Sequence, residues 1–157
     1  MVWEDLQPGS YTVSEMNPGD EWLTEISGSP AMIPITGGML EASVTNTRKR
    51  GGLQVSKSVD WGDNEPDPDK FFNICIRGPS HPETPNCQDI GYTGGMLSWS
   101  DLIPGLYIVT ETSPGMEWQV TVGGSPADVP ANGETGNATV ANVWMPPWKL
   151  YLPLVIR

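Results

Sequence analysis

Apolar and polar residues alternate in short stretches of this chain, and turn-forming residues separate the stretches. In LQVSKSVDW, residues 53–61, apolar side chains recur at every second position, as in a strand with one buried face. Comparable patterns predict strands near 53–61, 70–77, 87–92, 95–101, 106–112, 117–122 and 137–144, and the segment GPSHPETPN at 78–86 is one of the predicted turns. About seven short strands at this spacing predict an all-β, Greek-key sandwich of the immunoglobulin-like type.

An internal repeat relates the start of the chain to its second half. A shift of 96 positions matches, without a gap, Trp3 with Trp99, Tyr11 with Tyr107, Glu15 with Glu111, Trp22 with Trp118 and Asn46 with Asn142. Residues 51–145 therefore make one complete copy, residues 1–50 match only the C-terminal half of another, and 146–157 form a tail. We expect the missing half either to precede Met1 in a longer chain, the favoured interpretation, or to come from another chain.

Three polar residues interrupt rows of apolar side chains that face inward. Lys57 is in step with the apolar residues of 53–61, Glu111 with those of 107–109 and Asn142 with those of 138–144. One such residue alone is easily accommodated, by hydrogen bonds to the backbone or by a lysine that extends to solvent. Three in one domain would each cost several kcal/mol if buried without partners. We therefore expect the three side chains to meet.

A lysine, a glutamate and an asparagine that meet in an apolar interior can react. Desolvation favours the neutral forms of lysine and glutamate. A neutral Lys57 amine could attack the side-chain amide carbon of Asn142, while a protonated Glu111 polarises the carbonyl and relays protons as ammonia leaves. The product is an internal isopeptide bond, formed once per molecule, so we expect a structural protein rather than an enzyme with turnover.

The partial copy has the glutamate and the asparagine of this trio but lacks the lysine. Glu15 and Asn46 lie in the matching register, and the position equivalent to Lys57 would fall before Met1. Lys149 in the tail is a poor substitute, because its surroundings match 53–61 badly and Pro153 is unsuited to a central strand.

The order VSKSVD, then PGLYIVTET, then VANV resembles the collagen-adhesin B-type domains, also called SpaA-like or prealbumin-like domains, of bacterial surface adhesins and pilins. The resemblance covers residues 51–145 fully and 2–47 in part. It implies a prealbumin-like sandwich in which Lys57 is joined to Asn142 with the help of Glu111. It also implies an extracellular or cell-surface stalk or adhesin module whose partners are neighbouring repeats and a host protein, matrix protein or glycan.

The two cysteines, Cys75 and Cys87, flank the proline-rich stretch that contains His81. We favour a disulfide that closes a hairpin, and hence an oxidising compartment. A metal site is the rival interpretation, but the chain has one histidine and no Cys-x-x-Cys pair. We expect His81 to be a surface turn residue, and no metal or cofactor to be bound.

Composition and charge exclude some functions. The chain has 8 Lys and Arg against 19 Asp and Glu, a formal charge of −11 that repels nucleic-acid phosphates and anionic membranes. No apolar stretch approaches the roughly 20 residues of a membrane helix. The apolar, proline-broken tail 146–157 carries no sortase signal and is expected to be an edge strand, a docking segment or a linker remnant.

Other functions remain open beside the stalk module. Seven tryptophans favour a glycan-binding module, although Trp22 and Trp118 recur after a Pro-Gly turn and are expected to cap the core. A transthyretin-like accessory domain of a larger enzyme is a third possibility. An acidic loop at 60–70 could hold calcium, but its spacing does not match an EF-hand and a solvated loop is the favoured interpretation.

Overall fold

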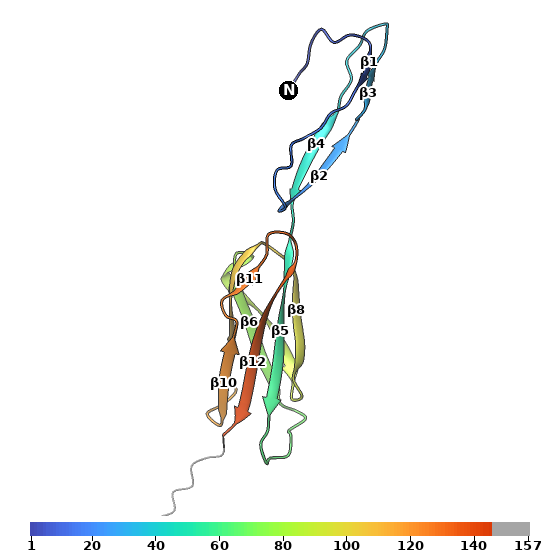
Figure 1. Ribbon diagram of the computed structural model, residues 1–157. Coiled ribbons are helices and arrows are strands. Elements are labelled where there is room, and N and C mark those ends of the chain that lie inside the picture. The colour runs from blue at the N-terminus through green and yellow to red at the C-terminus, as the bar shows by residue number, and fades with distance from the viewer. Residues whose placement is uncertain (146–157) are drawn as a thin grey trace, which may run out of the picture. The chain divides into compact units, whose positions relative to one another are not determined.

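The computed structural model describes residues 1–145, and within them every regular element is a β-strand (Figure 1). The chain divides between Lys49 and Arg50 into two compact units. The tail 146–157, with its three alternative interpretations, lies outside the described residues. No helix in the described residues is long and apolar enough to cross a membrane.

The second unit is a sandwich of two four-stranded sheets. Its strands are β5 (Gly51–Asp60), β6 (Phe71–Gly78), β7 (His81–Gly91), β8 (Gly95–Leu102), β9 (Gly105–Glu111), β10 (Trp118–Gly123), β11 (Ala127–Val129) and β12 (Thr135–Trp144). One sheet has the order β10-β12-β5-β8 and the other β11-β9-β6-β7. Of the consecutive strands, only β6 and β7 pair as a hairpin, and every other connection joins strands that are not neighbours. The predicted all-β, Greek-key sandwich is confirmed.

The first and last strands of this unit lie side by side. β5 and β12 run parallel, with Lys57 opposite Val140 and Val59 opposite Asn142, at the centre of their sheet (Figure 1). Parallel neighbours cannot be joined by a tight turn and need a long connection. Here that connection is nearly the whole domain, so the first and last strands are hydrogen-bonded neighbours while the two chain ends lie at opposite ends of the pair.

The core follows the alternation seen in the sequence. Along β5 the buried positions are every second residue, and those of β6, β9 and β12 alternate in the same way. The inner faces of the two sheets contribute a cluster in which Leu53, Val55, Ile74, Ile76, Tyr107 and Val140 are all fully buried. Burial of the aliphatic side chains holds the two sheets together. The buried Tyr107 ring directs its hydroxyl to the loops, where it forms hydrogen bonds with Ser80 Oγ and the Ile103 carbonyl.

Two segments differ from the sequence-based prediction. Residues 81–86, predicted as a turn, are part of strand β7, so His81 begins a strand instead of lying in a loop. β7 is at the edge of its sheet, where Pro82 and Pro85 can be accommodated because an outward-facing edge position needs no ladder N–H. The short strand β11 was also not predicted, because three residues are too few to show an alternation.

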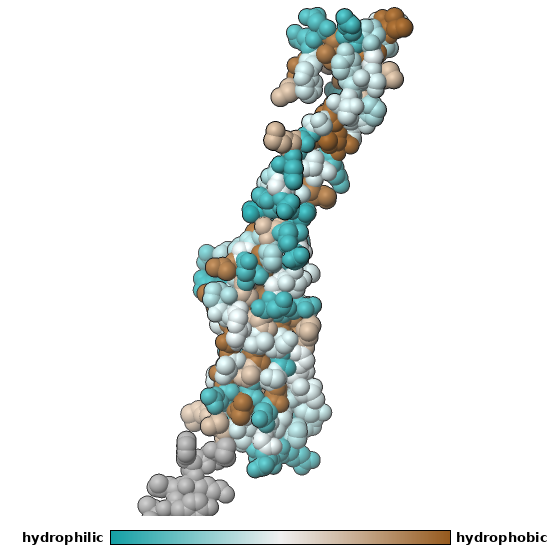
Figure 2. Space-filling model, in the orientation of Figure 1, coloured by the Kyte–Doolittle hydropathy of each residue, from teal (hydrophilic) through white to brown (hydrophobic). Residues whose placement is uncertain are grey.

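The first unit has only the second half of this architecture. Strand β1 (Gly9–Tyr11) pairs with β3 (Ala31–Ile33), and β2 (Trp22–Ser27) pairs with β4 (Ser43–Arg48). These strands match β9, β11, β10 and β12 after the shift of 96 residues. No residue of this unit is buried, and apolar side chains are visible on its surface as brown patches in Figure 2.

Candidate functional site

Lys57, Glu111 and Asn142 come together between the two sheets of the sandwich. Lys57 and Asn142 lie on the neighbouring parallel strands β5 and β12, two register positions apart and on the same face. Glu111 ends β9 in the opposite sheet, where it pairs with Ile74 of β6. The structure therefore brings together the three inward-facing polar residues that the sequence pattern selected.

One carboxylate oxygen joins the trio. Lys57 Nζ donates to Glu111 Oε1 at 3.1 Å and to Oε2 at 3.2 Å, and Asn142 Nδ2 donates to the same Oε1 at 2.9 Å. The side chains of Lys57 and Glu111 are fully buried, and Asn142 is 1 % exposed. The amine, the carboxylate and the carboxamide thus share one water-poor site.

The surroundings favour an uncharged amine. Burial lowers the pKa of the Lys57 ammonium from its usual 10.5, and the charge and hydrogen bonds of Glu111 offset that effect only in part. The ring of Phe72 lies 4.6 Å from Lys57 Nζ and supplies one wall of the site. Transfer of the proton from Lys57 to Glu111 would leave two neutral groups, which an apolar interior tolerates better than a charged pair.

One atom of the Asn142 side-chain amide lacks a hydrogen-bond partner. Its Oδ1 is buried without a hydrogen-bond partner, while its Nδ2 faces Glu111. A half turn of the amide exchanges these two atoms, which would place Oδ1 toward Glu111 and allow a protonated carboxyl to donate to it. The site therefore has a nucleophile, an electrophile and a proton carrier within hydrogen-bond reach.

The partial copy repeats this geometry without a lysine. Asn46 Nδ2 donates to Glu15 Oε1 at 2.9 Å, the same length as in the complete copy. Thr24, which stands where the complete copy has Val120, donates to Asn46 Oδ1 at 2.7 Å and lies 3.3 Å from Glu15 Oε2. The sequence reasoning did not single out Thr24, although a threonine at an otherwise apolar repeat position was a visible signal. Both Glu15 and Asn46 are exposed.

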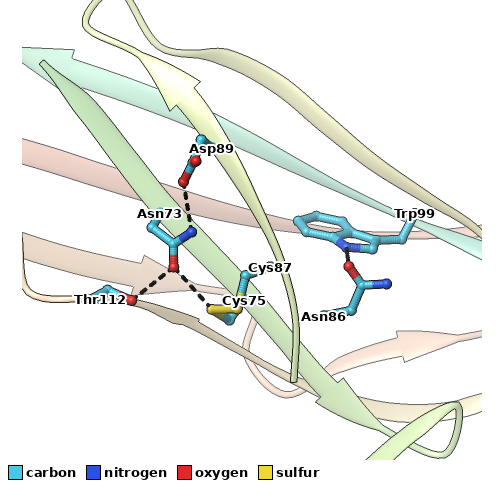
Figure 3. The surroundings of a disulfide bond; sticks show 7 residues. All are labelled: Asn73, Cys75, Asn86, Cys87, Asp89, Trp99 and Thr112. Carbon is cyan, nitrogen blue, oxygen red and sulfur yellow. Dashed lines mark hydrogen bonds between the residues drawn. A yellow bond between two sulfur atoms is a disulfide. The ribbon is translucent and has the colours of Figure 1, made fainter. Parts of the chain in front are cut away.

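The cysteines form the predicted disulfide on the outside of the hairpin. Cys75 and Cys87 are direct cross-strand partners on β6 and β7, and Figure 3 shows their bond beside the side chain of Asn73. Asn73 accepts from Thr112 Oγ1 at 3.0 Å and donates to Asp89 at 2.7 Å. The bond therefore fixes the edge strand β7 to β6, outside the polar site.

Four aromatic rings pack at one end of the sandwich. Trp118, at 7 % exposure, meets Phe72, Trp61 and Trp144 edge to face, with ring centroids 5.2, 4.9 and 5.1 Å away. Trp118 is therefore a capping residue of the core, as the sequence predicted. A pocket of about 330 Å³ lined by Trp61, Trp118 and Trp144 opens beside this cluster.

The acidic loop after β5 is held by local hydrogen bonds. Asp60 accepts from the backbone N–H of Gly62 at 2.8 Å, and Asp67 from that of Asp69 at 3.0 Å. Within residues 1–145, no group of three or more His, Cys, Asp or Glu side chains is placed to hold a metal ion. These carboxylates act as turn-forming residues in the structure.

No protein-family model matches the chain, and no curated protein matches it. Among solved structures, two crystal structures of the pilus-presented adhesin Cpa are similar in fold. Their TM-scores are 0.41 and 0.40 at 16 % and 19 % sequence identity, over 64 % and 62 % of this chain. The chain matches only 29 % and 28 % of the length of those adhesin chains. Membership of the collagen-adhesin B-type family stays a prediction.

Proposed function

We propose that residues 51–145 are a structural stalk module of a bacterial surface or secreted protein, made resistant to force by an isopeptide bond between Lys57 and Asn142. The observation that carries the proposal is the shared hydrogen-bond acceptor, Glu111 Oε1, which holds the amine and the amide together in a buried site. The module acts through its shape and its cross-link, and it carries out the reaction once.

The bond forms when Lys57 Nζ replaces the amide nitrogen Nδ2 of Asn142. Glu111 takes a proton from the Lys57 ammonium, and the neutral Nζ attacks Asn142 Cγ while the carbonyl electrons move to Oδ1. Glu111 then gives its proton to Nδ2 and accepts one from Nζ. The carbonyl reforms, the Cγ–Nδ2 bond breaks and ammonia leaves. Burial, which lowers the pKa of Lys57 from its usual 10.5, helps the first step because it increases the neutral fraction of the amine.

The strand arrangement makes the position of this bond mechanically useful. The module begins with β5 and ends with β12, and these strands are parallel neighbours. When the module is stretched from both ends, the force is applied at Gly51 and after Trp144. It would then pass along β5 to Lys57, through the Lys57–Asn142 bond, and along the last residues of β12. The residues between 57 and 142, including the disulfide, would be shielded from the load.

Single-molecule stretching tests this function. The second unit is pulled from both ends, and the gain in chain length on unfolding is recorded. The cross-linked module should not release the chain between 57 and 142. Glu111→Ala should release roughly 250 Å, the extended length of that segment without the 12-residue loop that the disulfide closes. Release of the full segment from the wild-type module would contradict the proposal.

Glycan binding is a second candidate, favoured by the pocket beside the tryptophan cluster. Trp118, which lines it, has a buried Nε1 without a hydrogen-bond partner, and the rings of Trp61 and Trp144 line it as well. Titration calorimetry with a panel of oligosaccharides tests this alternative. Heat that Trp61→Ala abolishes would support it, and an absence of heat with every sugar would dismiss it.

A further inference from the structure

We propose that Asn73 is a positioning residue of the cross-linking reaction, because it holds the end of strand β9 where Glu111 lies. It acts from the outer face of the sheet, through hydrogen bonds to Thr112 and Asp89. This inference rests on the proposed function, since it concerns the same reaction. It adds to that reaction a group of residues that never touch the reacting atoms.

Glu111 lies at an end of its strand, and strand ends open more easily than strand centres. On one side of β9, strand β11 pairs with residues 105–107, and the Ser125 hydroxyl bonds the backbone of Val109. These contacts end two residues before Glu111. Beyond Val109 the pairing that continues is the one with β6, which reaches Glu111. The position of Glu111 therefore depends on how firmly β9 is held to β6.

The backbone bond that closes this pairing lies one residue beyond the strand. The Thr112 N–H donates to the Asn73 carbonyl at 2.9 Å. Hydrogen-bonded and non-hydrogen-bonded pairs alternate along an antiparallel ladder, so the next pair, Glu111 and Ile74, exchanges no backbone bonds. Glu111 is therefore held against β6 by its chain neighbours Thr110 and Thr112. Loss of the Thr112 bond would free its backbone on one side.

Side chains reinforce this bond in a row that crosses three strands (Figure 3). Asn73 lies opposite Asp89 of β7, to which its Nδ2 donates at 2.7 Å, while its Oδ1 accepts from Thr112 Oγ1 at 3.0 Å. A carboxylate only accepts hydrogen bonds, so Asp89 fixes the direction of the Asn73 amide and leaves its oxygen facing Thr112. We call these three residues the outer clamp.

The outer clamp matters most after the proton has moved. Before the reaction, the Lys57 ammonium holds both oxygens of the Glu111 carboxylate, and such charge-assisted bonds are about twice as strong as neutral ones. Transfer of the proton to Glu111 removes this attraction, while the acid must still reach the Asn142 amide. A misplacement of about 1 Å can slow a reaction by about 100-fold. The backbone position of Glu111 therefore limits the rate at this stage.

The turn after Thr112 does not explain why a threonine is there. Residues 113–115 are Ser-Pro-Gly, and the first copy has Asn-Pro-Gly at the matching place, yet the counterpart of Thr112 is Met16. Met16 is 91 % exposed, and its side chain has no strong hydrogen-bond donor. The hydroxyl at position 112 is therefore a feature of the copy whose glutamate is paired with a lysine.

Time-resolved mass spectrometry of the full chain tests this role. The chain is synthesised in a cell-free system, synthesis is stopped, and samples denatured at successive times give the fraction that has lost one ammonia. The pH is set low enough that the neutral amine is scarce and the reaction is slower than folding, which tryptophan fluorescence follows. Any loss in Glu111→Ala is subtracted. Asn73→Ala and Thr112→Val should each slow the reaction about fivefold or more, the factor that one net hydrogen bond is worth.

A matched control lies on the same hairpin. Asn86 of β7 lies opposite Ile76, and its Oδ1 accepts from Trp99 Nε1 of the other sheet at 3.2 Å (Figure 3). Asn86→Ala should cost at least as much stability as Asn73→Ala and leave the rate unchanged. Exchanging two clamp residues, Asn73→Asp with Asp89→Asn, keeps an acceptor for Thr112 and a donor between β6 and β7. This exchange should restore the rate to within about twofold of the wild-type chain.

Three results would overturn the inference. They are equal rates in the wild-type chain and Asn73→Ala, an equal slowing by Asn86→Ala, and an exchanged pair that reacts as slowly as Asn73→Ala. In all three the wild-type chain still loses ammonia, so the proposed function stands. A folded wild-type chain that never loses ammonia refutes the proposed function itself, and the positioning role with it.

Discussion

The cross-link should dominate the stability of the second unit, and one double variant measures its contribution. Lys57→Met combined with Glu111→Gln removes the nucleophile and both buried charges while keeping the volume of the side chains. The methionine would lie against Phe72, whose ring is 4.6 Å from Lys57 Nζ, and the glutamine oxygen could still accept from Asn142. Replacing a buried ion pair as a unit is often close to neutral.

The size of the effect follows from the loop that the bond closes. Asn142 lies 85 residues after Lys57. Chain-entropy arithmetic for a cross-link of that span gives about 4–5 kcal/mol at 25 °C, borrowing the relation for disulfides. Lys57→Ala alone should cost more than the double variant, because it also removes the buried lysine stem and leaves a cavity against Phe72.

Guanidinium unfolding followed by tryptophan fluorescence measures the difference. The cross-linked protein should unfold with a free energy about 4–5 kcal/mol above that of the double variant. It should also have a smaller denaturant slope, because the linked unfolded chain exposes less surface. If the unfolding free energies of the wild-type protein and the double variant agree within about 1 kcal/mol and their slopes are equal, the reasoning is refuted. A difference of that size is within the error of extrapolation and shows no stabilisation by a cross-link.

The remaining predictions concern pH and the disulfide. In Asn142→Ala, which cannot react, Lys57 keeps a pKa below 10.5, so between that lowered pKa and 10.5 the unfolded chain binds more protons and stability should rise with pH. The rise should be absent when Lys57→Ala is added, and denaturation at a series of pH values checks both. Replacing Cys75 and Cys87 by serine opens a loop of 12 residues and should cost about 3 kcal/mol, measured by denaturant unfolding, without affecting the loss of ammonia. A disulfide-free variant that fails to lose ammonia would show that the site depends on the hairpin.

The sequence predicted the site better than the topology. Alternation marked Lys57, Glu111 and Asn142 as inward-facing, and inward-facing polar residues of one small core have few places to go other than toward one another. The pattern contained no information on which strands are neighbours, however. That β5 and β12 are parallel and adjacent depends on pairing over the whole domain, which local alternation does not specify.

The errors also have physical causes. Prolines at 82 and 85 suggested a turn, because the sequence does not show that β7 is an edge strand with one free side. The orphan Asn142 Oδ1 and the role of Thr24 depend on side-chain positions that only the packed structure defines. The open face of residues 1–49, in contrast, was foreseeable, because the repeat showed that half of the strands were missing.

The intact mass of the purified chain, denatured and reduced, tests the central claim most directly. Asparagine before glycine, as at Asn132, can also lose ammonia by cyclising on the backbone, so the comparison with variants decides. The account predicts a mass one ammonia below that of the sequence, and the full sequence mass in both Lys57→Ala and Glu111→Ala. A folded wild-type chain with its full mass, or a deficit that persists in both variants, would contradict it.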